Sequence, residues 1–236
     1  MGAVTATQLK TLKLTGLPKL KHIWEKDPEG TFNFQNLQTV TLVGCESLQS
    51  VFPASVSGKL KQLEFLGLDN CGVEVVIEKE GAQVAETLQF PKLTVLVLAS
   101  LPKLKCFSPG MCPSEWPSLK KLKVYGCGQI EMFALTFQER QLEASVPLFV
   151  VDEEVEVKQN EVITFSNLAY LKLDCLAVLE NFCSRSYSFN FPALEEVTMR
   201  QCPEMKIFCP GVLSTPKLKK VQATEEDQEG IGLRLT

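Results

Sequence analysis

The fold class that this sequence predicts is an α/β solenoid, in which short parallel strands stack into a curved sheet, and three observations predict it. An apolar ladder of the form L-x-x-V-x-M-x-x-C-x-x-M-x-x-F runs through Phe191–Phe208. The ladder returns about every 24 to 30 residues, with one interval of about 49. Within each copy the apolar residues alternate as L-x-L, as in a strand with one buried face. Together these features are typical of leucine-rich repeats, which stack into one continuous unit.

Eight copies of the ladder follow one another, and they begin at Leu9, Leu37, Leu63, Leu93, Leu119, Leu168, Leu194 and Leu218. In each copy the L-x-L pair, such as Leu171 and Leu173, is expected to point inward, and the residues beside it point outward from the concave face. A Leu or Cys three residues later turns the chain, and Pro102 after Leu101 favours that turn. The convex return path is expected to be mostly irregular or short-helical, with one short helix around Ser55–Gln62.

Residues 1–236 are expected to form a single leucine-rich repeat domain of about eight repeats. The long interval holds a long insertion or a degenerate repeat at 134–162, with the acidic run Asp152–Glu156. We interpret this run as a solvated loop, and the alternative is a lid or docking loop beside the sheet. A C-terminal cap is expected at 223–236, where acidic residues precede a short apolar tail.

The 9 cysteines indicate packing rather than crosslinking or metal binding. Four of them occupy the same repeat position: Cys45, Cys71, Cys127 and Cys202. A small, weakly hydrogen-bonding thiol fits under a tight turn, so we expect a buried slot with reduced thiols. His22 is the only histidine and no C-x-x-C pair occurs, so no metal site is expected.

Composition and motifs argue against several classes of function. The net charge of −4 disfavours a nucleic-acid binder, and no apolar run is long enough to span a membrane. A signal peptide and N-x-S/T sequons are absent, which favours a cytoplasmic location. His22 is the only imidazole available as a general base, and no G-x-x-x-x-G-K-[ST] phosphate loop occurs. We therefore expect neither an enzyme nor a bound cofactor.

Three blocks of the sequence carry a resemblance to a known family. They are LPKLKHIW (Leu17–Trp24), LPKLKCF (Leu101–Phe107) and CPEMKIF (Cys202–Phe208), and STPKL follows the last of them. The chain from Leu9 to Gln222 resembles the C-terminal repeats of plant intracellular nucleotide-binding, leucine-rich-repeat disease-resistance proteins of the coiled-coil class. The resemblance implies recognition of a pathogen effector, or of a host protein that the effector modifies. It also implies a role in keeping a neighbouring nucleotide-binding domain inactive.

An alternative is a leucine-rich repeat adaptor, such as the substrate receptor of a ubiquitin ligase. Those proteins also carry cysteine-bearing repeats, but they usually have more regular helices on the return path. Both functions require a protein partner, and neither requires a nucleic acid or a membrane.

The outward strand positions are the predicted partner site, because there residues of different repeats lie side by side. The candidates are Phe65, Val95, Val97, Lys121, Lys123, Tyr125, Tyr170, Lys172 and Arg200. The first three are expected to form an exposed apolar patch, and the others a charged half with two tyrosines. The same alternation places Gly67, Ala99 and Thr198 outward. The alternative is that all of these are ordinary solvated strand residues without a ligand.

Overall fold

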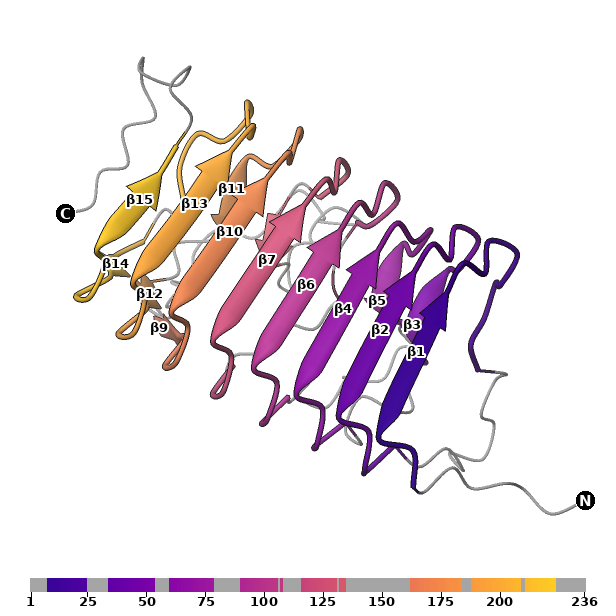
Figure 1. Ribbon diagram of the computed structural model, residues 1–236. Helices are drawn as coiled ribbons and strands as arrows, with labels where there is room; N and C mark the ends of the chain where they lie inside the picture. The colour runs from indigo at the N-terminus through magenta and orange to yellow at the C-terminus, as the bar shows by residue number, and fades with distance from the viewer. Residues whose placement is uncertain are drawn as a thin grey trace, which may run out of the picture.

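The protein is a solenoid built around one parallel sheet, shown by a computed structural model that describes residues 8–24, 34–53, 60–78, 90–105, 107, 116–130, 132–134, 162–183, 188–208 and 211–223. The main sheet has eight strands in the order β1-β2-β4-β6-β7-β10-β13-β15, so they follow the chain (Figure 1). They are β1 (Thr11–Thr15), β2 (Thr39–Val43), β4 (Phe65–Asp69), β6 (Val95–Ala99), β7 (Lys121–Tyr125), β10 (Tyr170–Asp174), β13 (Glu196–Arg200) and β15 (Lys220–Gln222). The predicted parallel sheet is confirmed.

The apolar ladder forms the inner face of this sheet. Neighbouring strands pair with the L-x-L positions in register, so that Leu171 lies beside Leu122 on one side and Val197 on the other. From β2 to β10 these positions are at most 1% exposed, as Leu98 and Leu171 illustrate. Side chains alternate along a strand, so burying the ladder commits the intervening residues to the opposite face.

In the described part of the chain, β2, β6, β7, β10 and β13 each have a tight turn on either side of the strand. Before the strand, the amide of Leu37 donates to the carbonyl of Phe34 over 3.0 Å. After the strand, the amide of Leu104 donates to the carbonyl of Leu101 over 3.3 Å, across Pro102. The turn predicted at this proline is therefore confirmed. Both turns begin on a buried apolar residue, which anchors the turn to the core.

The residue directly after the main strand adopts a left-handed backbone in seven successive repeats. These residues are Gly16, Gly44, Asn70, Ser100, Gly126, Cys175 and Gln201, with φ between 49° and 67°. The first six donate their amide to the last carbonyl of the next strand, as Gly44 does to Asp69 over 3.0 Å. The bend thus keeps the hydrogen-bond ladder intact while it directs the chain away from the sheet. Glycine and asparagine suit this conformation, whereas Ser100, Cys175 and Gln201 adopt it at a steric cost.

Short parallel strands, rather than helices, form the described part of the return path. One small sheet pairs β3 (Ser50–Phe52) with β5 (Val75–Ile77), and another pairs β8 (Met132–Ala134) with β11 (Asn181–Cys183). A third has the order β14-β12-β9, with β9 (Val162–Thr164), β12 (Ser188–Asn190) and β14 (Leu213–Ser214). These strands lie behind the main sheet in Figure 1.

The described residues therefore support a parallel β-solenoid, and they do not support the α/β label or a helical convex side. Of the helix expected around Ser55–Gln62, residues 55–59 lie outside the described part, and residues 60–62 lead into a turn. The described return path after β2 begins with the apolar pair Val51 and Phe52 of β3. Both are buried, and the extended backbone of β3 continues this packing into the next repeat through β5.

Aromatic rings fill the space between the main sheet and the return path. Phe90, Phe107 and Trp116 pack with centroid separations of 5.7 to 5.8 Å. Near the C-terminal end, Phe182 stacks on Phe208 at 4.8 Å and an interplanar angle of 9°. Such pairs add to the burial of apolar area, which is the main source of stability here.

The cysteine slot is confirmed for the four described repeats that carry it. Cys45, Cys71, Cys127 and Cys202 are buried free thiols. Each thiol donates to the carbonyl of the last strand residue, as Cys71 does to Asp69 at 3.3 Å and Cys127 to Tyr125 at 3.5 Å. Burial raises the pKa of the Cys71 and Cys127 thiols to about 11, so both stay protonated and unreactive near neutral pH.

The domain division stays a prediction. The segment 135–161 and the tail 224–236 lie outside the described residues, and with them the acidic run Asp152–Glu156 and most of the expected cap. The structure contains no helix, among the residues it describes, that is long and apolar enough to cross a membrane.

Candidate functional site: the open face of the main sheet

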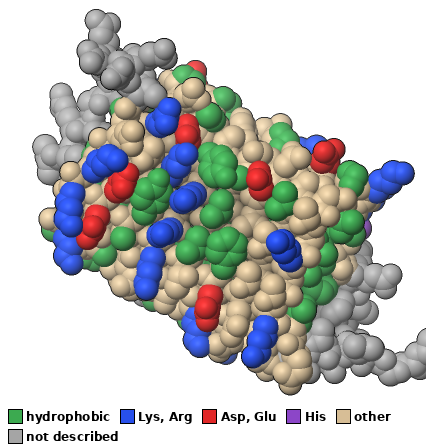
Figure 2. Space-filling model, viewed as in Figure 1, with side chains coloured by type: hydrophobic (Ala, Val, Ile, Leu, Met, Phe, Trp, Pro, Cys, Tyr) green, Lys and Arg blue, Asp and Glu red, His purple; other side chains and the backbone are tan. Residues whose placement is uncertain are grey.

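The outward side chains of the main sheet form three rows, which we call the open face. From β2 to β13 the first row is Thr39, Phe65, Val95, Lys121, Tyr170 and Glu196. The middle row is Thr41, Gly67, Val97, Lys123, Lys172 and Thr198, and the third is Val43, Asp69, Ala99, Tyr125, Asp174 and Arg200. All nine predicted site residues lie on this face. Those of the charged half lie on three adjacent strands, β7, β10 and β13. Figure 2 shows this face uncovered over its central part.

The N-terminal half of the open face is apolar but less exposed than predicted. Phe65, Val95 and Val97 are half-buried, so this patch exposes less apolar surface than the sequence indicated. The ring of Phe65 lies against Gly67, where an added Cβ would stand 2.8 Å from its Cε1. Gly67 is therefore buried, although it points outward.

Two other outward positions are also buried, against the sequence prediction. Ala99 is 0% and Thr198 is 5% exposed. Both are small side chains with larger register neighbours, Asp69 and Tyr125 beside Ala99 and Lys172 beside Thr198. An outward direction alone does not expose a residue when its neighbours are longer.

The C-terminal half of the open face contains five residues of β7 and β10 that we call the lysine–tyrosine cluster: Lys121, Lys123, Tyr125, Tyr170 and Lys172. Its contacts run diagonally between the strands. Lys123 Nζ lies 5.5 Å from the ring centroid of Tyr170, and Lys172 Nζ lies 5.2 Å from that of Tyr125. These are cation–π distances, and each such contact contributes about 0.5–1 kcal/mol at an exposed site. The cluster thus fixes two ammonium groups on two aromatic faces.

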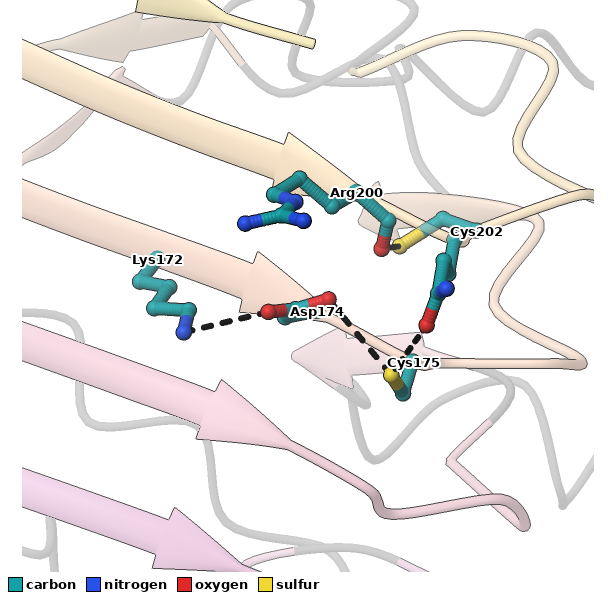
Figure 3. Close-up of polar contacts among 6 residues, drawn as sticks. Lys172, Asp174, Cys175, Arg200 and Cys202 are labelled. Carbon is teal, nitrogen blue, oxygen red and sulfur yellow. Dashed lines mark hydrogen bonds and ion pairs between the residues drawn. The ribbon is translucent and has the colours of Figure 1, made fainter. Parts of the chain in front are cut away.

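An acidic residue borders the cluster at its third row. Asp174 Oδ2 lies 3.0 Å from Lys172 Nζ, and its Oδ1 accepts a 3.5 Å bond from the Cys175 thiol (Figure 3). Cys175 also contacts Gln201 Oε1 at 2.6 Å. Desolvation and the neighbouring Asp174 raise the pKa of the Cys175 thiol, so this exposed cysteine is a poor nucleophile. Asp174 was not among the candidate site residues. Its position two residues after Lys172 in β10 was the sequence signal that it lies on the same face.

Cations outnumber anions in this half of the open face. Glu196 is paired with Lys220 at 3.1 Å, and Asp174 with Lys172. In the described part of the chain, Lys121, Lys123 and Arg200 form no ion pair. Figure 2 shows Lys and Arg side chains gathered around hydrophobic side chains over the middle and C-terminal strands. A chain with net charge −4 therefore presents a locally positive surface.

Chemically, this surface suits binding rather than bond breaking. It offers aromatic faces, phenol hydroxyls, ammonium groups and one guanidinium, which are frequent anchors of protein interfaces. Among the residues described, no three His, Cys, Asp or Glu side chains gather as a metal site would require. An uncovered parallel sheet on stacked repeats is the architecture of a leucine-rich repeat solenoid.

Comparisons with known proteins show which leucine-rich repeat proteins this chain resembles. A family model described as "Plant disease resistance protein RPS2-like, leucine-rich repeats" matches residues 2–72. A candidate disease resistance protein of Arabidopsis thaliana is 27% identical over 190 residues, which cover 77% of this chain. No solved structure matches. The leucine-rich repeats of this chain are thus similar to those of plant disease resistance proteins, as the sequence motifs indicated. The chain spans about 14% of the length of this curated relative.

Proposed function

We propose that this chain is the protein-recognition module of a plant immune receptor, and that its open face binds a pathogen effector or a host protein that the effector modifies. One observation carries the proposal: the open face joins half-buried apolar residues at Phe65 and Val97 to a lysine–tyrosine cluster with unpaired cations. Interface anchors of this kind gain affinity by desolvation when a partner covers them. The comparisons with disease resistance proteins support the same role.

We further propose that the module acts without catalysis, in the cytoplasm, and next to a nucleotide-binding domain that it helps to keep inactive. The resemblance of the three sequence blocks supports this arrangement. The single imidazole, His22, supports a non-enzymatic role, because a histidine base would have to be this residue, and it is exposed after the turn that follows β1.

The experiment is a binding measurement on the purified chain against a panel of effectors and host proteins. Once a partner is found, Tyr125→Ala and Tyr170→Ala are compared with Lys105→Ala and Lys206→Ala. The two control lysines are exposed and lie directly after the turns that follow β6 and β13. We expect each tyrosine variant to weaken binding at least about tenfold, as loss of an aromatic anchor does, and the controls to bind normally. Folded tyrosine variants with unchanged affinity would overturn the proposal.

A further inference from the structure

We propose that the lysine–tyrosine cluster selects a partner segment of defined chemistry: an extended acidic stretch of protein with an apolar residue two positions from a carboxylate. This inference rests on the proposed function and names the partner chemistry of the same surface. It follows from the register of three strands, from the charge of the open face and from the dimensions of an extended chain.

The first observation is an opposed pair of like charges. Lys123 and Lys172 face each other in register on β7 and β10, and both are half-buried. Like charges directly opposite on neighbouring strands destabilise a sheet. Asp174 neutralises only Lys172, and Lys121 adds a further cation one row away. A carboxylate placed above Lys123 and Lys172 would interact with both ammonium groups and remove this repulsion.

The second observation is that the cations are held in place. Each of the two lysines lies against a tyrosine of the other strand, at 5.5 and 5.2 Å from the ring centroid. A long side chain that is already ordered loses less entropy on binding, so the cluster is preorganised for an anion. The phenol hydroxyls of Tyr125 and Tyr170 supply further donors for carboxylate oxygens.

The third observation concerns spacing. Val97 lies next to Lys123 in the middle row, and Lys172 comes one strand further. Strands are about 4.8 Å apart, so the point between the two lysines lies about 7 Å from Val97. Side chains two apart on an extended chain project to one face about 6.6–7 Å apart. An extended segment that crosses the strands can therefore place an apolar side chain on Val97 and a carboxylate between the lysines.

A protein segment fits this surface better than a nucleic acid. Asp69 and Asp174 lie in the third row and Glu196 in the first, so carboxylates interrupt the positive area. A phosphate backbone requires a continuous basic track, and the whole chain is acidic. The apolar contact at Val97 also has no counterpart on a phosphate chain.

The test is fluorescence anisotropy on the full chain with a labelled peptide containing Leu-Ser-Glu-Ser-Glu. The controls are the same peptide with glutamine for both glutamates and a labelled single-stranded DNA. On the protein, Lys123→Gln and Lys172→Gln are compared with Lys105→Gln and Lys206→Gln, which remove equal charge outside the open face. We expect the glutamate peptide to bind at least about fivefold tighter than its glutamine counterpart, less tightly at high salt, and less tightly to the two cluster variants only.

Three results would overturn this inference: equal binding of the glutamate and glutamine peptides, full affinity of Lys123→Gln and Lys172→Gln, or DNA binding at least as tight as peptide binding. A failure of this inference can be distinguished from a failure of the proposed function. If the tyrosine variants still lose an identified partner whose segment is not acidic, the recognition surface stands and only the acidic preference is wrong. If neither peptide nor partner depends on the open face, both proposals are wrong.

Discussion

The strand pair β4–β6 and the strand pair β7–β10 have nearly identical inner faces, but the chemistry of their outer faces differs. Inside, every ladder residue of both pairs is a leucine or valine and is at most 1% exposed. In the first two outer rows, the first pair has phenylalanine, valine and a buried glycine, and the second has lysine and tyrosine, while each pair has one aspartate in the third row. The scaffold therefore does not dictate the surface. Substitutions on the open face should change recognition with little change in folding, and substitutions inside should do the reverse.

The largest expected effect concerns the shared inner face. Leu98→Ala in β6 and Leu171→Ala in β10 should each lower the free energy of unfolding by about 2–5 kcal/mol, because both remove a fully buried side chain. Chemical denaturation of the two variants is the measurement. Similar losses in both halves would support a uniform scaffold, and a loss in only one half would show that the two inner faces are not equivalent.

A smaller effect should distinguish two glycines that occupy the same repeat position. An added Cβ at Gly72 would stand 1.9 Å from the carbonyl oxygen of Glu46, whereas at Gly128 it would meet nothing within 4 Å. We expect Gly72→Ala to destabilise by about 1–3 kcal/mol, as overpacking does, and Gly128→Ala to stay within about 0.5 kcal/mol. Thermal melting of the two variants compares them directly, and equal melting temperatures would contradict the packing described at Gly72.

The cysteine slots should respond alike to pH in both halves. Burial raises the pKa of Cys71 and Cys127 to about 11, from an ordinary value near 9. Below pH 9 the thiols are protonated in both the folded and the unfolded chain, so stability should not depend on them. Between pH 9 and 11 the unfolded chain loses these protons first, and stability should fall. Cys127→Ala should reduce this alkaline loss in denaturation curves, and an unchanged loss would contradict the burial effect.

The smallest effect is expected on the open face. Lys123→Ala should change the free energy of unfolding by no more than about 0.5 kcal/mol, because losing its contact with Tyr170 is offset by relief of repulsion from Lys172. The same denaturation experiment serves as the check. A loss as large as that of Leu171→Ala would show that the inward and outward assignment is wrong.

The fold was largely predictable from the sequence because one periodic pattern determines it. Leu171 and Leu173 alternate with lysine and aspartate, and that alternation sets which face of the strand is buried. The return of the whole ladder in each repeat sets the parallel direction and the register of the strands. The turn at Pro102 follows from the restricted backbone of proline. The left-handed backbone of the residue after each main strand was not visible in the sequence. Glycine is the usual signal for it, but Ser100, Cys175 and Gln201 occupy three of these positions.

The site was only partly predictable, because exposure and pairing depend on neighbours in other repeats. Sequence alternation correctly placed Tyr125 and Lys172 on one face but did not show that they contact each other. It also could not show that Phe65 covers Gly67. The contact of Phe65 with Gly67 depends on the orientation of one side chain within β4. The contact of Lys172 with Tyr125 depends on strand register, which joins residues that are tens of positions apart.

The central claim is that the open face of β7, β10 and β13 recognises the partner. Its most direct test is effector-triggered cell death in a plant, with Tyr125→Ala, Tyr170→Ala and Arg200→Ala introduced into the receptor that we propose contains these repeats. Protein abundance and folding are measured alongside, with Lys206→Ala as the control. Our account predicts loss of the response in the three open-face variants and a normal response in the control. Folded open-face variants that retain full recognition would contradict it.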